Sequence, residues 1–205
     1  MNNIDVNGDS IWYTRNGDIV TMHVTAKIFN NSSDNINMAR AAKDIVSDIK
    51  STYEGKFEWS DNKTYNLKVD MDLKVATSMK DVENSDHLFV LADSDSKGAR
   101  GATSMLGGKV MTLASSDFAN NNWLSNNLSY NKTFTATHEF GHAIGLSHSQ
   151  NPFNIMKQGG VFHNSNSTQR KVMLQQQYNI NRGSNSLNYM NRKIPYPYVH
   201  YDNNI

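Results

Sequence analysis

The chain of 205 residues contains no cysteine. This absence excludes a disulfide framework and a thiolate metal site, so any bound metal must use histidine, aspartate or glutamate. A cysteine-free composition is also compatible with export from a bacterium, where an unpaired thiol would be oxidised. A single domain of this length removes roughly 70% of its unfolded surface from water, so it can form a stable core without cross-links.

Long apolar runs and a strong net charge are also missing. No stretch approaches the ~20 apolar residues of a membrane span. Residues 1–17 lack the charged start and apolar run of a secretory signal, so we expect that a signal was removed or that the domain is delivered by another route. The formal net charge is +1 and the basic residues are scattered, which argues against nucleic acid or an anionic membrane as partners. We expect a soluble monomer.

The spacing of hydrophobic residues predicts several strands. Some segments alternate hydrophobic and polar residues, and others are short continuous apolar runs of the kind found in buried parallel strands. The predicted strands are 18–29, 65–76, 87–92, 99–105 and 109–114, with a further edge strand at 11–13.

Helical spacing predicts three helices. The first covers 35–53, with Ser33 or Asp34 as its N-cap. The second covers 133–146 and the third covers 168–178. Strands and helices in this order favour an α/β (α+β) fold with a twisted mixed sheet.

The second predicted helix carries a pattern of metal-binding residues. His138, Glu139 and His142 are followed by Gly145 and His148. Residues four apart lie on the same face of an α-helix, so His138 and His142 can bind one ion. On a continuing helix His148 would lie ~9 Å further along the axis and out of reach. Gly145 can adopt the left-handed conformation that ends a helix, which makes His148 a plausible third ligand.

Such a site has a defined chemistry. Three protein ligands leave the fourth position of a tetrahedral zinc ion open for water, which is typical of a catalytic site. We expect zinc to lower the pKa of that water and Glu139 to accept its proton, after which the hydroxide attacks a carbonyl polarised by the metal. The same carboxyl can then protonate the leaving amine. The pattern is a known signature of zinc peptidases, and it predicts one catalytic zinc ion.

The segment from His138 to Ser149 resembles the zinc-binding helix of the metzincin clan, and within it the matrixins, almost residue for residue. Asn154, Ile155 and Met156 fall where these proteins have their Met-turn. The resemblance implies that Met156 lies beneath the metal as a hydrophobic floor and is not a ligand. It also implies a zinc endopeptidase acting on protein or peptide substrates.

The same resemblance implies how one catalytic domain spanning 1–205 is organised. After an N-terminal segment, 1–17, an upper subdomain covers 18–148. A small, mostly irregular lower subdomain with one helix covers 149–205, and zinc lies in the cleft between the two. In this family an extended substrate pairs with the edge strand of the upper rim, whose counterpart here is the predicted strand 99–105.

Some residues depart from the family pattern. Gln158 stands where matrixins usually have proline and astacin-like relatives have tyrosine, and a cysteine-free chain cannot block zinc with a propeptide cysteine. His163 falls in the loop after the Met-turn, which would form a wall of the specificity pocket. Asp93 begins a segment that resembles a calcium loop, but Lys97 and Ser104 stand at its fifth and twelfth positions, so calcium is only a minor expectation.

The asparagine bias and the missing signal favour a secreted or delivered bacterial protease, a toxin or effector that acts outside the producing cell. A second enzymatic version would cut peptide cross-links of bacterial cell walls. The alternative from another class is a non-catalytic zinc-containing module that binds a partner protein through the edge strand. Glu139 favours the enzyme, because a binding module needs no carboxylate at that place.

Overall fold

The computed structural model describes residues 10–83, 85–93, 101–104, 106–119, 133–160 and 162–175. Its strands and α-helices are β1 (Ile11–Asn16), β2 (Ile19–Asn31), α1 (Met38–Tyr53), β3 (Gly55–Glu58), β4 (Thr64–Ala76), β5 (His87–Ala92), β6 (Gly101–Thr103), β7 (Val110–Ala114), α4 (Phe134–Ala143) and α5 (Ser167–Gln175). None of the helices in these ranges is long and apolar enough to cross a membrane.

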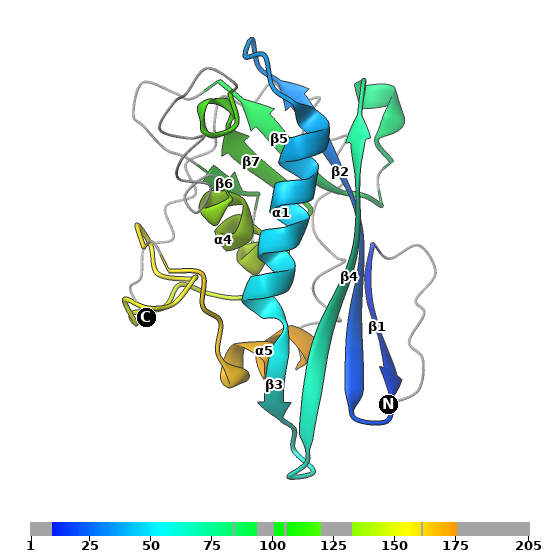
Figure 1. Cartoon of the computed structure of the whole chain (residues 1–205), viewed down its shortest axis with the longest axis vertical. Coiled ribbons are helices and arrows are strands. Elements are labelled where there is room, and N and C mark those ends of the chain that lie inside the picture. The colour runs from blue at the N-terminus through cyan, green and yellow to red at the C-terminus, as the bar shows by residue number, and fades with distance from the viewer. Residues whose placement is uncertain are drawn as a thin grey trace.

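The strands form one mixed sheet. Its order is β3-β4-β2-β5-β7-β6, and β1 pairs with β2 beside this path. The neighbouring pairs among β4, β2, β5 and β7 are parallel, whereas β1, β3 and β6 are antiparallel to their partners. Helices α1 and α4 lie on the same face of the sheet, and α5 lies beside β3 at one end (Figure 1). The structure confirms the predicted mixed α+β fold, with β6 at the sheet edge.

Burial explains the two kinds of strand sequence. On β2 every second residue is buried, as the alternating sequence of the predicted strand 18–29 indicates, and these residues are Val20, Met22, Val24, Ala26 and Ile28. After His87, strand β5 is apolar because both of its faces are covered. Its Phe89 and Leu91 belong to the main core with the helices, whereas Leu88 and Val90 pack in a smaller cluster with Val82 and Val110.

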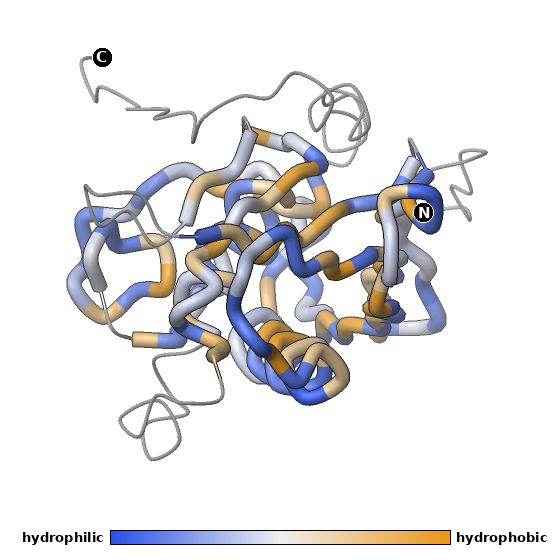
Figure 2. Tube along the Cα trace, turned by 90° about the horizontal axis from the view of Figure 1, so that it is seen from above, coloured by the Kyte–Doolittle hydropathy of each residue, from blue (hydrophilic) through white to orange (hydrophobic). Residues whose placement is uncertain are grey.

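Helix α1 begins at Met38, three residues later than the predicted start. The N-cap is Asn37, whose side chain accepts a hydrogen bond from the backbone N–H of Arg40 at 3.0 Å. The two predicted caps have other partners, since Ser33 donates to Asp93 and Asp34 accepts from the Ser115 hydroxyl. Figure 2 shows the amphipathic character of α1, with hydrophobic residues toward the rest of the chain and hydrophilic residues on the outer side.

Two further features differ from the sequence prediction. Strand β3 was not predicted, because its four residues contain a single buried hydrophobic side chain, Phe57, and give no periodic signal. The alternation of the predicted strand 65–76 places Val75 on the same face as the buried Leu67 and Val69, but Val75 is 40% exposed. The alternation of β4 ends after Leu73, and Ala76 is the next buried residue.

Arg170 on α5 closes the C-terminal end of α1. Its Nε donates to the backbone oxygen of Tyr53 at 2.9 Å and its Nη2 to that of Glu54 at 3.0 Å. Gly55 leaves room for the guanidinium, since a Cβ there would lie 2.9 Å from its Cζ. Carbonyl groups at a helix end lack partners within the helix, and Arg170 supplies donors for them.

We predict that Arg170→Met lowers the free energy of unfolding by about 2–4 kcal/mol, because several charge-assisted hydrogen bonds to half-buried or exposed backbone carbonyls are lost together. Urea unfolding followed by circular dichroism measures the change. Lys171→Met is the matched control on the same helix, and its effect should stay within about 0.5 kcal/mol. Equal effects of the two substitutions would contradict this role of Arg170.

His87 is fully buried at the start of β5. Its Nδ1 contacts the Ser10 hydroxyl, and its Nε2 has no hydrogen-bond partner among the described residues. Burial, assisted by the charge of Lys109, lowers the pKa of His87 to about 3. The imidazole therefore stays neutral in the folded protein well below the pH at which it takes up a proton in the unfolded chain.

His87 should therefore make the protein sensitive to acid. The contribution of neutral His87 to the free energy of unfolding is fully present above pH ~6.5. It is lost as the pH falls toward ~3, because only the unfolded state gains the proton in this window. We expect His87→Gln to reduce the dependence of the unfolding free energy on pH by up to about 1.4 kcal/mol per unit between pH 5.5 and 4. If the free energies of unfolding of the metal-free wild type and the metal-free His87→Gln variant depend on pH in the same way, this prediction is wrong.

Candidate active site

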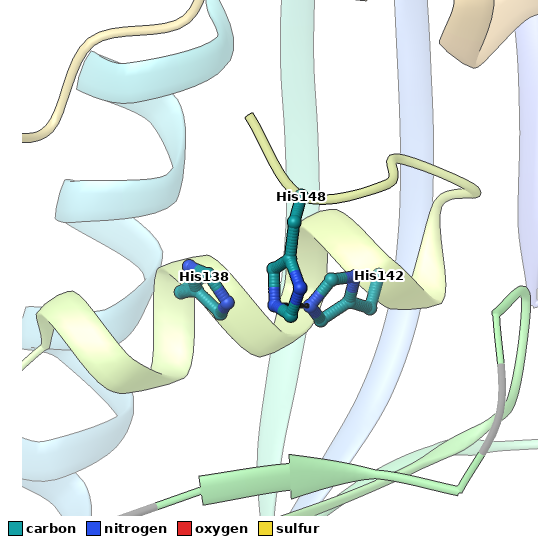
Figure 3. Close-up of side chains that lie close together, drawn as sticks. All are labelled: His138, His142 and His148. Carbon is teal, nitrogen blue, oxygen red and sulfur yellow. Dashed lines mark hydrogen bonds between the residues drawn. The ribbon is translucent and has the colours of Figure 1, made fainter. Parts of the chain in front are cut away.

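Helix α4 is fixed in the core by its apolar side. The Phe140 ring lies 6.0 Å from that of Tyr53 on α1 and 6.5 Å from that of Phe89 on β5, centroid to centroid. His138 and His142 lie one turn apart on the helix and come near His148 (Figure 3). The core thus sets the orientation of the helix that carries the first two histidines.

The chain leaves the helix at Gly145, as the sequence predicted, although α4 itself ends at Ala143 and not at the predicted Leu146. Gly145 has a φ of +87°. Its N–H donates to the oxygen of His142 at 3.0 Å, and the N–H of Leu146 donates to that of Gly141 at 2.9 Å. These two bonds define a Schellman motif, which strongly favours glycine at the left-handed position.

The turn brings the third histidine to the first two. The ligand atoms of His138, His142 and His148 all lie within 4.8 Å of one another, and the Nε2 atoms of His142 and His148 are 3.1 Å apart. Figure 3 shows the three rings gathered beside α4. Within the described ranges this is the single cluster of three histidine, aspartate or glutamate residues with metal-ligand spacing.

Backbone carbonyls fix the orientation of two of these rings. Nδ1 of His138 lies 2.7 Å from the oxygen of Ile155, and Nδ1 of His142 lies 2.7 Å from that of Leu146. A carbonyl can only accept, so each Nδ1 carries the hydrogen and each Nε2 keeps a free lone pair. Metal-binding histidines are commonly held in this way.

The cluster is also in the protonation state that a metal needs. Burial lowers the pKa of His138 to about 4 and that of His142 to about 3. Partial burial and then the charge of Lys157 lower the pKa of His148. Imidazole binds metals in its neutral form. Three neutral nitrogen donors fit a tetrahedral zinc ion with one open position.

Glu139 lies between α4 and the edge strand β6. The Thr103 hydroxyl is 2.6 Å from its Oε2 and 2.9 Å from its backbone oxygen. Burial raises the pKa of Glu139 to about 7, while the hydrogen bonds from Thr103 oppose that shift. Gly101 permits this close approach, because a Cβ there would lie 2.3 Å from Cγ2 of Thr135 and 2.9 Å from Cγ of Glu139.

Met156 packs beneath α4 at the turn between the two helical histidines. A Cβ at Gly141 would lie 2.3 Å from its Sδ and 2.5 Å from the Tyr53 hydroxyl. That hydroxyl donates to the oxygen of Thr137 at 2.9 Å. Met156 itself is fully buried. This location agrees with the hydrophobic floor that the family resemblance implied.

Sequence reasoning missed the residues that support the motif. Gly101 and Thr103 were recognised only as part of an edge strand, and Tyr53 only as a hydrophobic residue of the first helix. No local signal marks them, because their partners lie far away in the sequence.

Gln158, the residue that departs from the family pattern after the Met-turn, is exposed.

Parts of several predictions fall outside the described residues. These are positions 94–100 of the calcium-like segment, 99, 100 and 105 of the predicted edge strand, and 176–178 of the third predicted helix. Positions 1–9 of the N-terminal segment, 84, 94–100, 105 and 120–132 of the upper subdomain, and 161 and 176–205 of the lower subdomain also lie outside them.

Comparisons with known proteins identify the family and a similar fold. The model of the matrixin family (Peptidase_M10) matches residues 13–180. Among solved structures, archaemetzincin from Methanopyrus kandleri has a similar fold, with a TM-score of 0.50 and 11% identity over 79% of this chain and 97% of that one. No curated protein sequence matches significantly.

The fold and the histidine cluster together define a metzincin-type zinc peptidase. The chain belongs to the matrixin family, and it is a zinc metalloprotease.

We predict that Gly145→Ala weakens zinc binding, because alanine disfavours a φ of +87° by about 1–2 kcal/mol and the turn that places His148 must shift. Competition with a chromophoric chelator measures the affinity. Gly17→Ala is the matched control, since Gly17 also has a positive φ and open space around it but lies in the β1–β2 hairpin. Both substitutions should lower stability, and only Gly145→Ala should lower zinc affinity.

Proposed function

We propose that this matrixin is an endopeptidase in which His138, His142 and His148 hold one zinc ion and Glu139 transfers the protons of peptide hydrolysis. The observation that carries the proposal is the convergence of three ring nitrogens, two of them on rings whose Nδ1 is bound to a backbone carbonyl. When bound, zinc supplies Lewis acidity, which polarises a carbonyl group and makes water more acidic.

Glu139 is the residue we assign to proton transfer. It directly follows the first histidine on α4, and its carboxyl group is buried against β6. The Thr103 hydroxyl restrains Oε2, so the carboxyl has a fixed orientation. From this place it accepts a proton from the attacking water and later donates one to the leaving amine.

Strand β6 offers a place for an extended substrate. It pairs with β7 on one side and ends the sheet. A peptide that adds to the other side would form main-chain hydrogen bonds there, a recognition mode that depends on the backbone and tolerates many side chains. Because Thr103 of β6 contacts Glu139, such a peptide would lie next to the assigned catalytic group.

We also propose that the enzyme is a secreted or delivered bacterial protease, a toxin or effector, that acts outside the producing cell. The cysteine-free, asparagine-rich composition supports this setting. Fractionation of a producing culture, followed by detection with a specific antibody, tests it. Recovery of the protein from the cell interior alone would contradict the proposal.

We predict that Glu139→Gln lowers kcat/KM by about 10²–10⁴-fold, which is the typical contribution of a general acid or base. The variant should still bind one zinc ion. Cleavage of a proteome-derived peptide library and the zinc content of the purified protein are the measurements. Glu58→Gln, at an exposed residue of β3, is the matched control and should cleave like the wild type.

Two results of this experiment would contradict parts of the proposal. Equal cleavage by the wild type and Glu139→Gln would remove Glu139 from its assigned role. Zinc binding by both without cleavage by either would contradict the endopeptidase and favour the non-catalytic binding module.

A further inference from the structure

We propose that Asp48 is a positioning residue of the metal site, which holds both the zinc-binding helix and the loop after the Met-turn to α1. The inference rests on the proposed set of zinc ligands. Asp48 lies in the middle of α1, and its side chain is 16% exposed. It binds no metal itself but acts through its neighbours.

The first contact joins Asp48 to α4. The Thr137 hydroxyl donates to Oδ2 of Asp48 at 2.7 Å. Thr137 is fully buried and directly precedes His138 and Glu139. Its backbone oxygen also accepts the hydroxyl hydrogen of Tyr53. Helix α1 therefore holds both the side chain and the carbonyl of the residue next to the first ligand.

The second contact joins Asp48 to the loop after the Met-turn. Nδ1 of His163 lies 2.8 Å from Oδ1 and 2.7 Å from Oδ2 of Asp48, and the His163 side chain is 8% exposed. The backbone oxygen of the next residue, Asn164, accepts a hydrogen bond from the N–H of Ile155 at 2.8 Å. Ile155 is the residue whose own oxygen accepts from Nδ1 of His138. Asp48 thus reaches the first ligand by a second route.

Aromatic packing gives a third connection. The Phe134 ring stacks on His138 with 6.0 Å between centroids, and it meets His163 edge to face at 5.3 Å. A shift of His163 would therefore also change the packing around His138. One route runs through Thr137 and two run through His163, and all three lead toward the imidazole of His138.

Burial makes the carboxylate hard to replace. Removing it would take away the acceptor that the Thr137 hydroxyl and Nδ1 of His163 now contact, which disfavours their present positions. Asp44, one turn earlier on α1, provides a contrast, because its side chain is 39% exposed and forms an ion pair with Arg40 at 3.6 Å on the same helix. The two aspartates lie on the same helix but differ in their contacts.

Zinc affinity of the full chain, measured by competition with a chromophoric chelator, tests the proposal. Substitutions that disturb the partners of metal ligands typically weaken binding about 10- to 100-fold. We expect such a loss for Asp48→Asn, and an altered visible spectrum of the cobalt-substituted protein. Asp44→Asn should behave like the wild type in both measurements. Unfolding curves identify the temperature at which every variant is folded.

Thr137→Val and Thr137→Ser address the same question if Asp48→Asn does not fold. Valine removes the donor and should weaken zinc binding, whereas serine keeps the hydroxyl and should restore it. Equal affinities of Asp48→Asn and Asp44→Asn, or of the two Thr137 variants, would overturn the proposal.

His138→Ala separates this result from a failure of the ligand assignment. If His138→Ala binds zinc like the wild type, the proposed metal site itself is wrong. If His138→Ala loses zinc but Asp48→Asn does not, only the role of Asp48 is wrong.

Discussion

The site depends on one constraint, which is that each imidazole must turn its Nε2 toward a common point. For His138 and His142 this is achieved by a hydrogen bond from Nδ1 to a backbone carbonyl. One carbonyl belongs to Leu146 in the turn that follows Gly145, and the other to Ile155 in the Met-turn. The same chain reversals that deliver His148 and Met156 therefore also orient the helical histidines, so ligand placement and ligand orientation are inseparable in this fold.

The metal-binding motif could be predicted because its elements are local. Helix periodicity relates His138 to His142, and the conformational freedom of glycine accounts for the turn at Gly145. Strands with clear alternation, such as β2, could be predicted for the same reason. The start of α1 could not be predicted in this way, because Ser33, Asp34 and Asn37 are all good N-cap residues. In the structure Ser33 is hydrogen-bonded to Asp93 and Asp34 to Ser115, so Asn37 is the N-cap.

The residues around the motif could not be predicted, because their contacts span much of the chain. Asp48 and Thr137 are 89 positions apart, and Thr103 is recognisable as a partner of Glu139 only after β6 is placed beside α4. Strand β3 is a similar case, since it exists through its pairing with β4 and contains little apolar sequence of its own. Local patterns thus identify the residues that we propose to bind zinc and transfer protons, whereas long-range packing determines what surrounds them.

Helix α1 substitutes for the cross-links that a cysteine-free chain lacks. The segment after the Met-turn is attached to it by side chains of three residues, namely His163 to Asp48, Ser165 to the oxygen of Thr52, and Arg170 to the oxygens of Tyr53 and Glu54. Each contact uses a buried or half-buried polar group, so the attachment requires a defined geometry. This segment is therefore held by hydrogen bonding to a helix whose buried residues belong to the core.

Strand β6 forms one edge of the sheet. Open sheet edges are templates on which other chains can form sheets, and long, flat edges favour aggregation. Within the described residues β6 comprises Gly101–Thr103, so it presents few main-chain donors and acceptors to another chain. The extended peptide that we propose as substrate would use these same groups. A bound peptide would therefore also cover this edge.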